Sequence, residues 1–287
     1  PPLDIFPIAQ WKQLTNRYWQ MIFGNGLVST PTDFGVQGAL PSHPELLDWL
    51  AVDFKENNWD IRRLIKQLVT SETYKQRVIF GHEKNDIDPN NILLARGNSH
   101  RLPAEMIRDN ALVTSGLLNG TIGGPSVKPH QPEGLWEETT SGQGLTQYQP
   151  DGGVNRYRRS LYTFWKRTVP PPNMITFDAP TRDLCTVERQ KTSTPLQSLV
   201  LLNDPQFYSA AEAIANKIDT EDTLQTEREK ILKLFRTITL RTPNEAEKKL
   251  LSDYFDALLS NNEQASENPL VDMALLIYNL DETTQKS

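Results

Sequence analysis

The sequence predicts a mainly α fold: an irregular multi-helix domain with a long Gly/Pro-rich loop region and a short strand or hairpin element. First, apolar residues recur at helical spacing in the first and last thirds of the 287 residues. Second, three capping-box patterns, in which Ser or Thr precedes Glu or Gln by three positions, begin at Ser42, Thr194 and Thr242. Third, 15 glycines and 20 prolines argue against a long helical bundle or a coiled coil.

The expected helices follow this spacing along the chain. In the first part they lie at residues 11–22, 46–54, 61–69 and 102–118. Gly24 supplies the stop signal of the first helix, and Ser42 and Asp60 supply the N-caps of the second and third. In the last third, helices are expected at residues 196–202, 207–218, 228–240, 250–259 and 270–280.

The middle of the chain has a different character. Residues 119–155 are rich in glycine and proline without a period, which is typical of a functional or mobile loop. The aromatic-rich segment Arg158 to Trp165 is expected to form a strand. We therefore divide the chain into an N-terminal helical part (1–118), a loop and Arg/aromatic part (119–192) and a C-terminal helical part (193–287), and expect one compact unit.

Composition excludes several classes of protein. No apolar run approaches the roughly 20 residues of a membrane-spanning helix, so no membrane span is expected. The single cysteine, Cys185, excludes an internal disulfide framework and a C-x-x-C-H haem site, and we expect it to pack as a small hydrophobic side chain. The histidines His43, His82, His100 and His130 lack the spacing of a zinc site. We therefore expect no metal and no cofactor in this chain.

Positive charge is concentrated in one segment of an otherwise acidic chain. Between Gly152 and Thr192 eight basic residues stand against three acidic ones, although the whole chain carries a net charge of −6. Arginine-rich, aromatic segments suit anionic ligands, while a pI of about 5.4 disfavours a nucleic-acid partner. The candidate ligand-binding residues are Arg158, Arg159, Tyr162, Trp165, Lys166, Arg167, Arg182 and Arg189, together with His43, which lies at a helix start.

Two other interpretations remain open for these residues. In one interpretation the arginines are internal and pair with acidic side chains of the helices, and we expect Arg158 or Arg159 to be buried in a salt bridge. Alternatively the protein is a hydrolase in which His43 and loop carboxylates serve as acid and base. The candidate carboxylates are Asp178 with Asp183, and Glu133 with Glu137 and Glu138. His130, between Pro129 and Gln131, could face a cleft, but nothing in the sequence requires it.

Several strings occur together and in order along nearly the whole chain. They include Asn16-Arg17-Tyr18-Trp19, Pro41-Ser42-His43-Pro44-Glu45, Tyr157-Arg158-Arg159-Ser160-Leu161-Tyr162, Phe177-Asp178-Ala179-Pro180 and Thr192-Ser193-Thr194-Pro195-Leu196-Gln197. With them the chain resembles the PSD-one domain, a C-terminal domain of unknown function in large planctomycete-type proteins. The resemblance implies an exported, multidomain parent that often carries a cytochrome-c-like module upstream, and an extracytoplasmic location. It implies no catalytic residues.

The leading functional hypothesis combines these observations. The chain is expected to be the C-terminal module of an exported multidomain protein, which binds an anionic ligand such as a polysaccharide or docks to upstream domains. A hydrolase acting on a polysaccharide and a purely structural domain of a cytochrome-c-bearing assembly are the alternatives.

Overall fold

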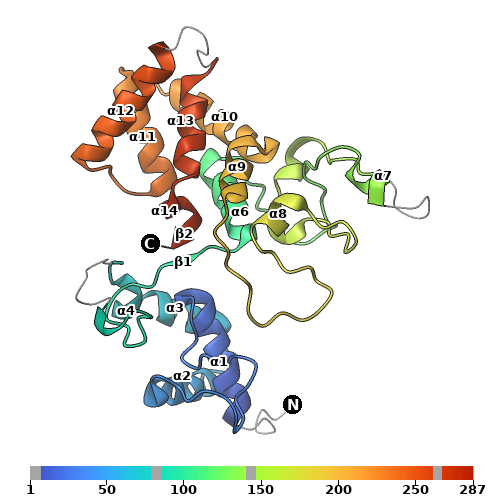
Figure 1. The fold of residues 1–287 in the computed structure, drawn as a ribbon, viewed down its shortest axis with the longest axis vertical. Coiled ribbons are helices and arrows are strands. Elements are labelled where there is room, and N and C mark those ends of the chain that lie inside the picture. The colour runs from blue at the N-terminus through green and yellow to red at the C-terminus, as the bar shows by residue number, and fades with distance from the viewer. Residues whose placement is uncertain (1–7, 79–85, 140–146, 261–266, 287) are drawn as a thin grey trace. The chain divides into compact units, whose positions relative to one another are not determined.

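The computed structural model describes residues 8–78, 86–139, 147–260 and 267–286, and within these ranges the fold is mainly α, as the sequence predicts (Figure 1). The chain divides into two compact units, and the three stretches suggested by composition stay a prediction. Unit 1 comprises Pro1–Arg101 with Thr186–Glu188 and Gln285–Ser287, and unit 2 comprises Leu102–Cys185 and Arg189–Thr284.

Unit 1 is a small helical unit with an aromatic-rich core. Its elements are α1 (Ile8–Phe23), α2 (Pro44–Glu56), α3 (Ile61–Val69), α4 (Glu72–Lys75) and a two-stranded antiparallel ladder of β1 (His100–Arg101) and β2 (Gln285–Lys286). Trp19 stacks on Phe23 with 4.0 Å between ring centroids. Gly24 ends α1 at a φ of +83°, and a Cβ there would lie 2.8 Å from the His100 ring. The predicted helices of this unit are confirmed.

One predicted cap in unit 1 is wrong by one residue. The N-cap of α2 is His43 instead of Ser42, which places Pro44 at the first helical position. The Ser42 hydroxyl lies 3.0 Å from the His43 ring nitrogen Nδ1. At α3 the prediction is confirmed, because Asp60 Oδ1 accepts a hydrogen bond from the Arg63 backbone N–H at 3.0 Å.

Unit 2 is built around α10 (Pro205–Asp219). This helix packs against α6 (Ala104–Ser115), α9 (Pro195–Asn203), α11 (Glu227–Thr239) and α13 (Pro269–Tyr278). The unit is completed by α7 (Leu135–Thr139), α8 (Pro172–Thr176), α12 (Glu245–Ser260), α14 (Asp281–Thr284) and the 3₁₀ turns η2 (Gly153–Tyr157) and η3 (Ser160–Tyr162). Alanines at 210 and 211 and Ile214 of α10 have no exposed surface, so small side chains let the neighbouring helices approach closely.

The predicted caps of unit 2 are confirmed in one case and wrong in the other. Thr194 and Gln197 form the predicted capping box at the start of α9. Thr242 is not a cap: Asn244 Oδ1 accepts from the Glu247 N–H at 2.9 Å, and Glu247 Oε2 accepts from the Asn244 N–H at 2.7 Å. The N-cap of α12 therefore lies two residues after the predicted one, and the helix begins at Glu245.

The predicted strand from Arg158 to Trp165 is also wrong. Its backbone makes the i to i+3 bonds of 3₁₀ turns, from the N–H groups of Tyr162 and Thr163 to the carbonyls of Arg159 and Ser160. Single bridges, such as Val127 with Thr163, replace a ladder. The physical reason is that side chains of α6 bind the backbone at the start of this segment: Arg108 donates to the Arg158 carbonyl and Asp109 accepts from the Ser160 N–H.

Within the described residues, no helix combines the length and the apolar character needed to cross a bilayer.

Candidate functional site

Arg158 is the most buried of the predicted ligand-binding residues, with 5% of its surface exposed. Its guanidinium donates to the carbonyl oxygens of Pro125 at 2.7 Å, Thr121 at 3.1 Å and Gly123, and lies 3.9 Å from the centre of the Tyr162 ring. The predicted burial of Arg158 or Arg159 is therefore confirmed. The predicted carboxylate partner is wrong, because backbone carbonyls accept from Arg158, while Arg159 is exposed.

The remaining cations of this segment contact separate partners. Lys166 lies over the Trp136 ring at 4.3 Å, Arg182 lies over Trp165 at 4.4 Å, and Arg189 pairs with Glu105 at 2.6 Å. The polar atoms of the aromatic residues are engaged as well: Tyr162 Oη accepts from the Gly123 N–H at 2.7 Å, and Trp165 Nε1 donates to the Thr181 carbonyl at 2.8 Å. Arg167 is exposed. Within the predicted set, Arg158 contacts Tyr162 and Arg182 contacts Trp165, while Lys166 and Arg189 contact residues outside the set. The anion site stays a prediction.

The acid–base candidates have local structural partners. His43 is the half-buried N-cap of α2 in unit 1, where it contacts Ser42. Asp178 Oδ2 accepts from the Thr192 N–H at 2.7 Å and so closes the loop between these residues. Cys185 is exposed, so the expectation that it packs as a hydrophobic side chain is wrong.

A metal site requires ligand side chains that lie close together in the described part of the chain. No group of three or more His, Cys, Asp or Glu side chains in it could hold a metal ion. His82 lies outside the described residues. The expected absence of metal and cofactor stays a prediction.

A buried arginine that the sequence reasoning missed organises the irregular part of unit 2. Arg108 of α6 is 4% exposed. It donates to the carbonyls of Arg156 at 2.7 Å and Arg158 at 2.9 Å, to Ser160 Oγ at 3.1 Å and to Gln206 Oε1 at 2.6 Å. Its neighbour along the helix, Asp109, accepts from the Ser160 N–H at 2.7 Å. This arrangement fastens the segment 156–160 to α6 and leaves Arg108 at the base of a cleft.

The cleft has two adjoining parts, which share His130 and Asn173. The larger part is a groove of about 480 Å³ along α8 and α9, which we call the α9 groove. Its lining is mostly aliphatic and proline, namely Leu196, Leu199, Val200, Pro132, Pro172 and Pro205, with the polar residues His130, Asn173, Thr176, Asn203 and Asp204. The hypothesis that His130 faces a cleft is confirmed.

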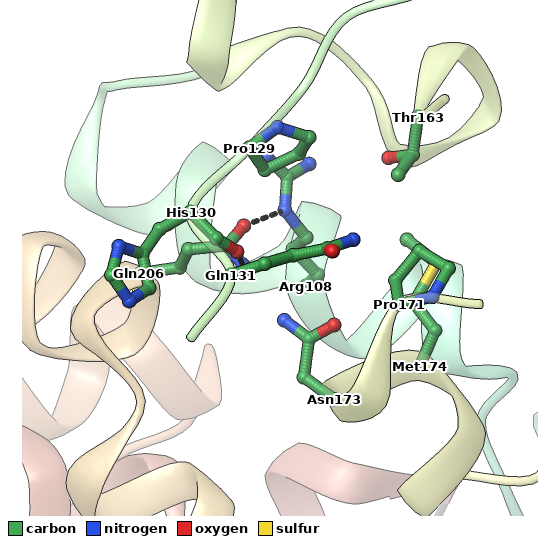
Figure 2. Close-up of a pocket in the computed structure, with 9 residues that line it drawn as sticks. All are labelled: Arg108, Pro129, His130, Gln131, Thr163, Pro171, Asn173, Met174 and Gln206. Carbon is green, nitrogen blue, oxygen red and sulfur yellow. Dashed lines mark hydrogen bonds between the residues drawn. The ribbon is translucent and has the colours of Figure 1, made fainter. Parts of the chain in front are cut away.

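The smaller part is a narrow crevice beside the groove, which we call the Arg108 crevice (Figure 2). It is lined by Arg108, Pro129, His130, Gln131, Thr163, Pro171, Asn173, Met174 and Gln206. Two of its polar side chains, Gln131 and Thr163, are each only 4% exposed. Thr163 Oγ1 is buried and has no hydrogen-bond partner. A buried hydroxyl without a partner carries a free-energy cost, so it is a feature that calls for an explanation.

The cleft has a mixed electrostatic character. Burial lowers the pKa of Arg108 to about 10, while Asp109 and Asp204 oppose this shift. Burial likewise raises the pKa of Asp204, against the opposing hydrogen bond from the Gln206 N–H. Both Asp204 oxygens are engaged, because Oδ1 accepts from Gln206 N at 2.8 Å and Oδ2 accepts from Asn173 Nδ2 at 3.2 Å. Asp204 is thus first of all the N-cap of α10.

The sequence contains weak signals for this cleft. Pro129 and Pro132 bracket His130 and Gln131, and Asp204 followed by Pro205 is a recognisable helix start. Neither signal indicates that these segments meet, because residues 131, 173 and 204 are distant in the sequence and border the cleft only in the folded chain.

Comparison with known protein families gives one result. Residues 9–255 match the PSD1 family, described as a protein of unknown function (DUF1553). The chain therefore belongs to this family, in agreement with the resemblance found in the sequence. Neither the search of curated proteins nor the search of solved structures returned a match.

Proposed function

We propose that this domain is a binding module that docks a polypeptide segment in the α9 groove. The observation that carries the proposal is the lining of this groove, in which aliphatic and proline side chains surround a few polar groups. Concave, mostly apolar surfaces with a few convergent polar groups are the usual form of a ligand site. This proposal takes up the docking half of our sequence-based hypothesis.

The chemistry of the lining favours a polypeptide over a polyanion or a sugar chain. Among the groove-lining residues, Asp204 is the one carboxylate, and neither lysine nor arginine is present, which disfavours a negatively charged ligand. None of these lining residues is Phe, Tyr or Trp, the side chains whose large apolar faces usually stack on sugar rings. Charge complementarity therefore favours a neutral or basic polypeptide segment with apolar side chains.

The exposed apolar surface of α9 supplies a source of affinity. Leu196 is 56% exposed and Leu199 is 53% exposed, although both line the groove. Covering a leucine side chain completely stabilises a complex by about 1.5–3 kcal/mol, so covering these half-exposed residues contributes part of that for each. Asn173 and Asn203 provide polar atoms at the same surface, which suits the alternation of apolar side chains and backbone amides in an extended segment.

A displayed library of random peptides, selected against the full chain, tests this proposal. Selected peptides should bind the wild type and lose at least tenfold in affinity for Leu199→Glu, because a carboxylate in the groove opposes apolar burial. The matched control is Leu250→Glu on α12, where Leu250 is 70% exposed and is not among the groove-lining residues. Failure to select any peptide, or equal binding to Leu199→Glu, would overturn the proposal.

The other parts of the sequence-based hypothesis remain proposals without a specific observation in their favour. They are binding of an anionic polysaccharide by Arg159, Arg167 and their neighbours, upstream domains of an exported parent as the source of the docked segment, and an extracytoplasmic location. The hydrolase and the purely structural domain also stay alternatives.

A further inference from the structure

We propose that the α9 groove binds a positively charged side chain of the docked segment, and that Asp204 is the residue that receives this charge. The inference rests on the proposed function and deepens it, because it names a residue type that the segment carries and its place in the groove. It is carried by the position of Asp204, by the unfilled acceptor capacity of its carboxylate, and by its lack of an ion-pair partner among the described residues.

Asp204 lies where α9 ends and α10 begins. It follows the last residue of α9 and is the N-cap of α10. The groove-lining residues of α9 have the i, i+3, i+4, i+7 spacing of one helix face, and they are Leu196, Leu199, Val200 and Asn203. The groove therefore follows this face and reaches Asp204 at the C-terminal end of the helix. A segment in it has an apolar wall along its length and a carboxylate at one end.

The Asp204 carboxylate keeps acceptor capacity in the folded chain. An ionised carboxylate has about four lone-pair sites for hydrogen bonds. Two of them are used, because Oδ1 accepts from the Gln206 N–H and Oδ2 accepts from Asn173 Nδ2. Both donors are neutral amides, so they do not neutralise the negative charge. A ligand ammonium or guanidinium group supplies further N–H donors together with the opposite charge.

No cation of the described part of the chain forms an ion pair with Asp204. Burial raises the pKa of Asp204, although Arg108 and His130 both act on it electrostatically in the opposite direction. The Arg108 guanidinium already donates to four other acceptors, and it is not available for a direct contact. The charge of Asp204 is thus incompletely compensated within the chain, and a basic side chain of the ligand supplies what is lacking.

The geometry of α9 sets the spacing between the apolar and the basic residue of the ligand. At a rise of about 1.5 Å per residue, Leu199 and Leu196 lie about 8 Å and about 12 Å before Asp204 along the helix axis. An extended chain advances about 3.3 Å per residue, and every second side chain points to the same side. We therefore expect the basic residue two positions from an apolar residue that covers Leu199, or four positions from one that covers Leu196.

The composition of selected peptides is the first test. Peptides selected from the random library against the full chain, at about pH 8 and so above the usual titration range of histidine, should be enriched in Lys or Arg at these two spacings from an apolar residue. Selected peptides without this enrichment would overturn the inference.

Asp204→Asn is the decisive variant, because it removes the charge while asparagine remains a good N-cap. A selected peptide should bind this variant about tenfold more weakly, and added salt should weaken binding to the wild type more than to the variant. The matched control is Asp60→Asn, which changes the N-cap of α3 in unit 1 and no groove-lining residue, and which should keep the wild-type affinity. Equal affinities of Asp204→Asn and the wild type would contradict the proposed contact.

A change in the peptide tests the same contact without altering the protein. Replacing the basic residue by norleucine removes the charge and keeps an apolar stem. This change should weaken binding to the wild type about tenfold, and it should cost little further in Asp204→Asn, because the two changes remove the same interaction. A loss on acetylating the peptide N-terminus, with no loss for norleucine, would assign the charge to the terminal amine and overturn the choice of a side chain.

Leu199→Ala separates this inference from the proposed function, because it removes apolar contact without adding a charge. It should weaken the basic peptide and the norleucine peptide alike. Peptides that depend on Leu199 and not on Asp204 would overturn the charged contact and leave the groove proposal intact, whereas failure to select any peptide would overturn both.

Discussion

Two neighbouring regions of unit 2 are stabilised by different physical means. The helical region from α9 to α14 is held together by apolar side chains such as Ile214, Leu234 and Met273, none of which has exposed surface. In the irregular region, described for residues 119–139 and 147–185, the side chains of Arg108 and Arg158 donate to backbone carbonyls, in addition to apolar contacts such as those of Met174 and Phe177. In a helix the backbone N–H and C=O groups form hydrogen bonds with one another. The buried carbonyls of an irregular segment need other donors, and an arginine side chain has five N–H donors.

The largest effect is expected for the loss of Arg108. In Arg108→Met the carbonyls of Arg156 and Arg158 and the Gln206 amide oxygen lose their donor within a buried region. We expect unit 2 to lose about 3–5 kcal/mol of unfolding free energy, because buried acceptors are left without partners. Chemical denaturation of the full chain measures this loss. Arg159→Met, at an exposed neighbouring position, should cost no more than about 0.5 kcal/mol, and equal effects of the two variants would contradict the comparison.

A somewhat smaller effect is expected for the core of the helical region. Leu234→Ala on α11 removes a side chain with no exposed surface and should cost about 3 kcal/mol through lost burial and the cavity left behind. Leu250→Ala on α12, where the leucine is 70% exposed, should change the unfolding free energy by about 0.5 kcal/mol or less. Thermal unfolding followed by circular dichroism measures both changes. If Leu234→Ala costs no more unfolding free energy than Leu250→Ala, apolar packing does not dominate this region.

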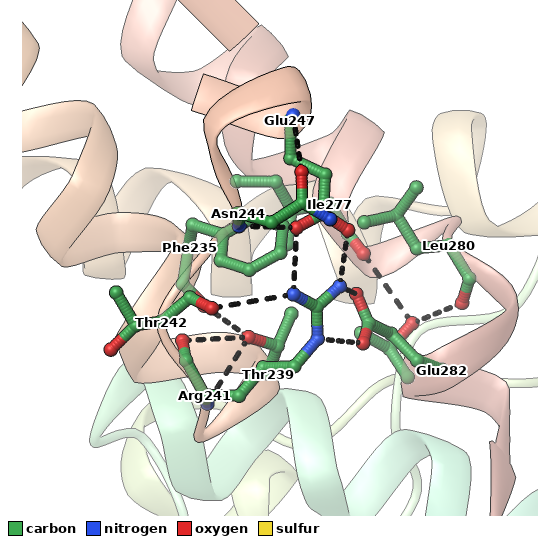
Figure 3. Close-up of polar contacts among 10 residues, drawn as sticks. Phe235, Thr239, Arg241, Thr242, Asn244, Glu247, Ile277, Leu280 and Glu282 are labelled. Carbon is green, nitrogen blue, oxygen red and sulfur yellow. Dashed lines mark hydrogen bonds and ion pairs between the residues drawn. The ribbon is translucent and has the colours of Figure 1, made fainter. Parts of the chain in front are cut away.

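The helical region also contains an arginine with several polar contacts, Arg241, but its partners are carboxylates and not backbone carbonyls (Figure 3). Arg241 lies between Glu247 and Glu282, with N–O distances of 2.6 Å to each, and over the Phe235 ring at 4.8 Å. Because its side chain is 40% exposed, we expect Arg241→Gln to cost only about 1–2 kcal/mol at neutral pH.

The cost of Arg241→Gln should depend on pH. The hydrogen bond from Arg241 holds the pKa of Glu247 below its usual 4.5. A lowered carboxylate pKa contributes stability that is present above the ordinary value and is lost as the pH falls through the folded value. The difference between wild type and Arg241→Gln should therefore shrink below about pH 4. A difference that is constant from pH 7 to pH 3 would assign the effect of Arg241 to packing on Phe235.

The smallest effects are expected at the helix caps. Thr226 Oγ1 accepts from the Glu229 N–H at 3.2 Å at the start of α11, so Thr226→Ala should cost about 1 kcal/mol. Ser42→Ala should cost almost nothing, because His43 is the N-cap of α2. The thermal midpoints of the two variants measure this difference. A larger decrease for Ser42→Ala than for Thr226→Ala would show that Ser42 is the N-cap of α2, as the sequence predicts.

The sequence by itself determined the longer helices, because both the apolar spacing and the stop signals are local. The short helices α4, α7, α8 and α14 were not predicted. It left the start of a helix uncertain by one or two residues where two cap patterns overlap. Thr242 and Asn244 are both acceptable N-caps, and the choice falls on Asn244, whose partner Glu247 is also bound by Arg241. The strand prediction for residues 158–165 failed because β propensity depends on the residue types of the segment alone. It contains no information about the Arg108 side chain on α6, which donates to the backbone of this segment.

The cleft was decided by the tertiary structure alone. The sequence indicates that Gln131 and Asn173 are polar residues near prolines, and nothing more. Which end of each amide is free depends on Trp136, five residues away, and on Asp204, 31 residues away, after the chain has folded. Helical periodicity depends on residues that are close in the sequence. Which polar atoms of a site remain without a hydrogen bond depends on contacts between segments that are distant in the sequence, and those contacts form only when the elements pack.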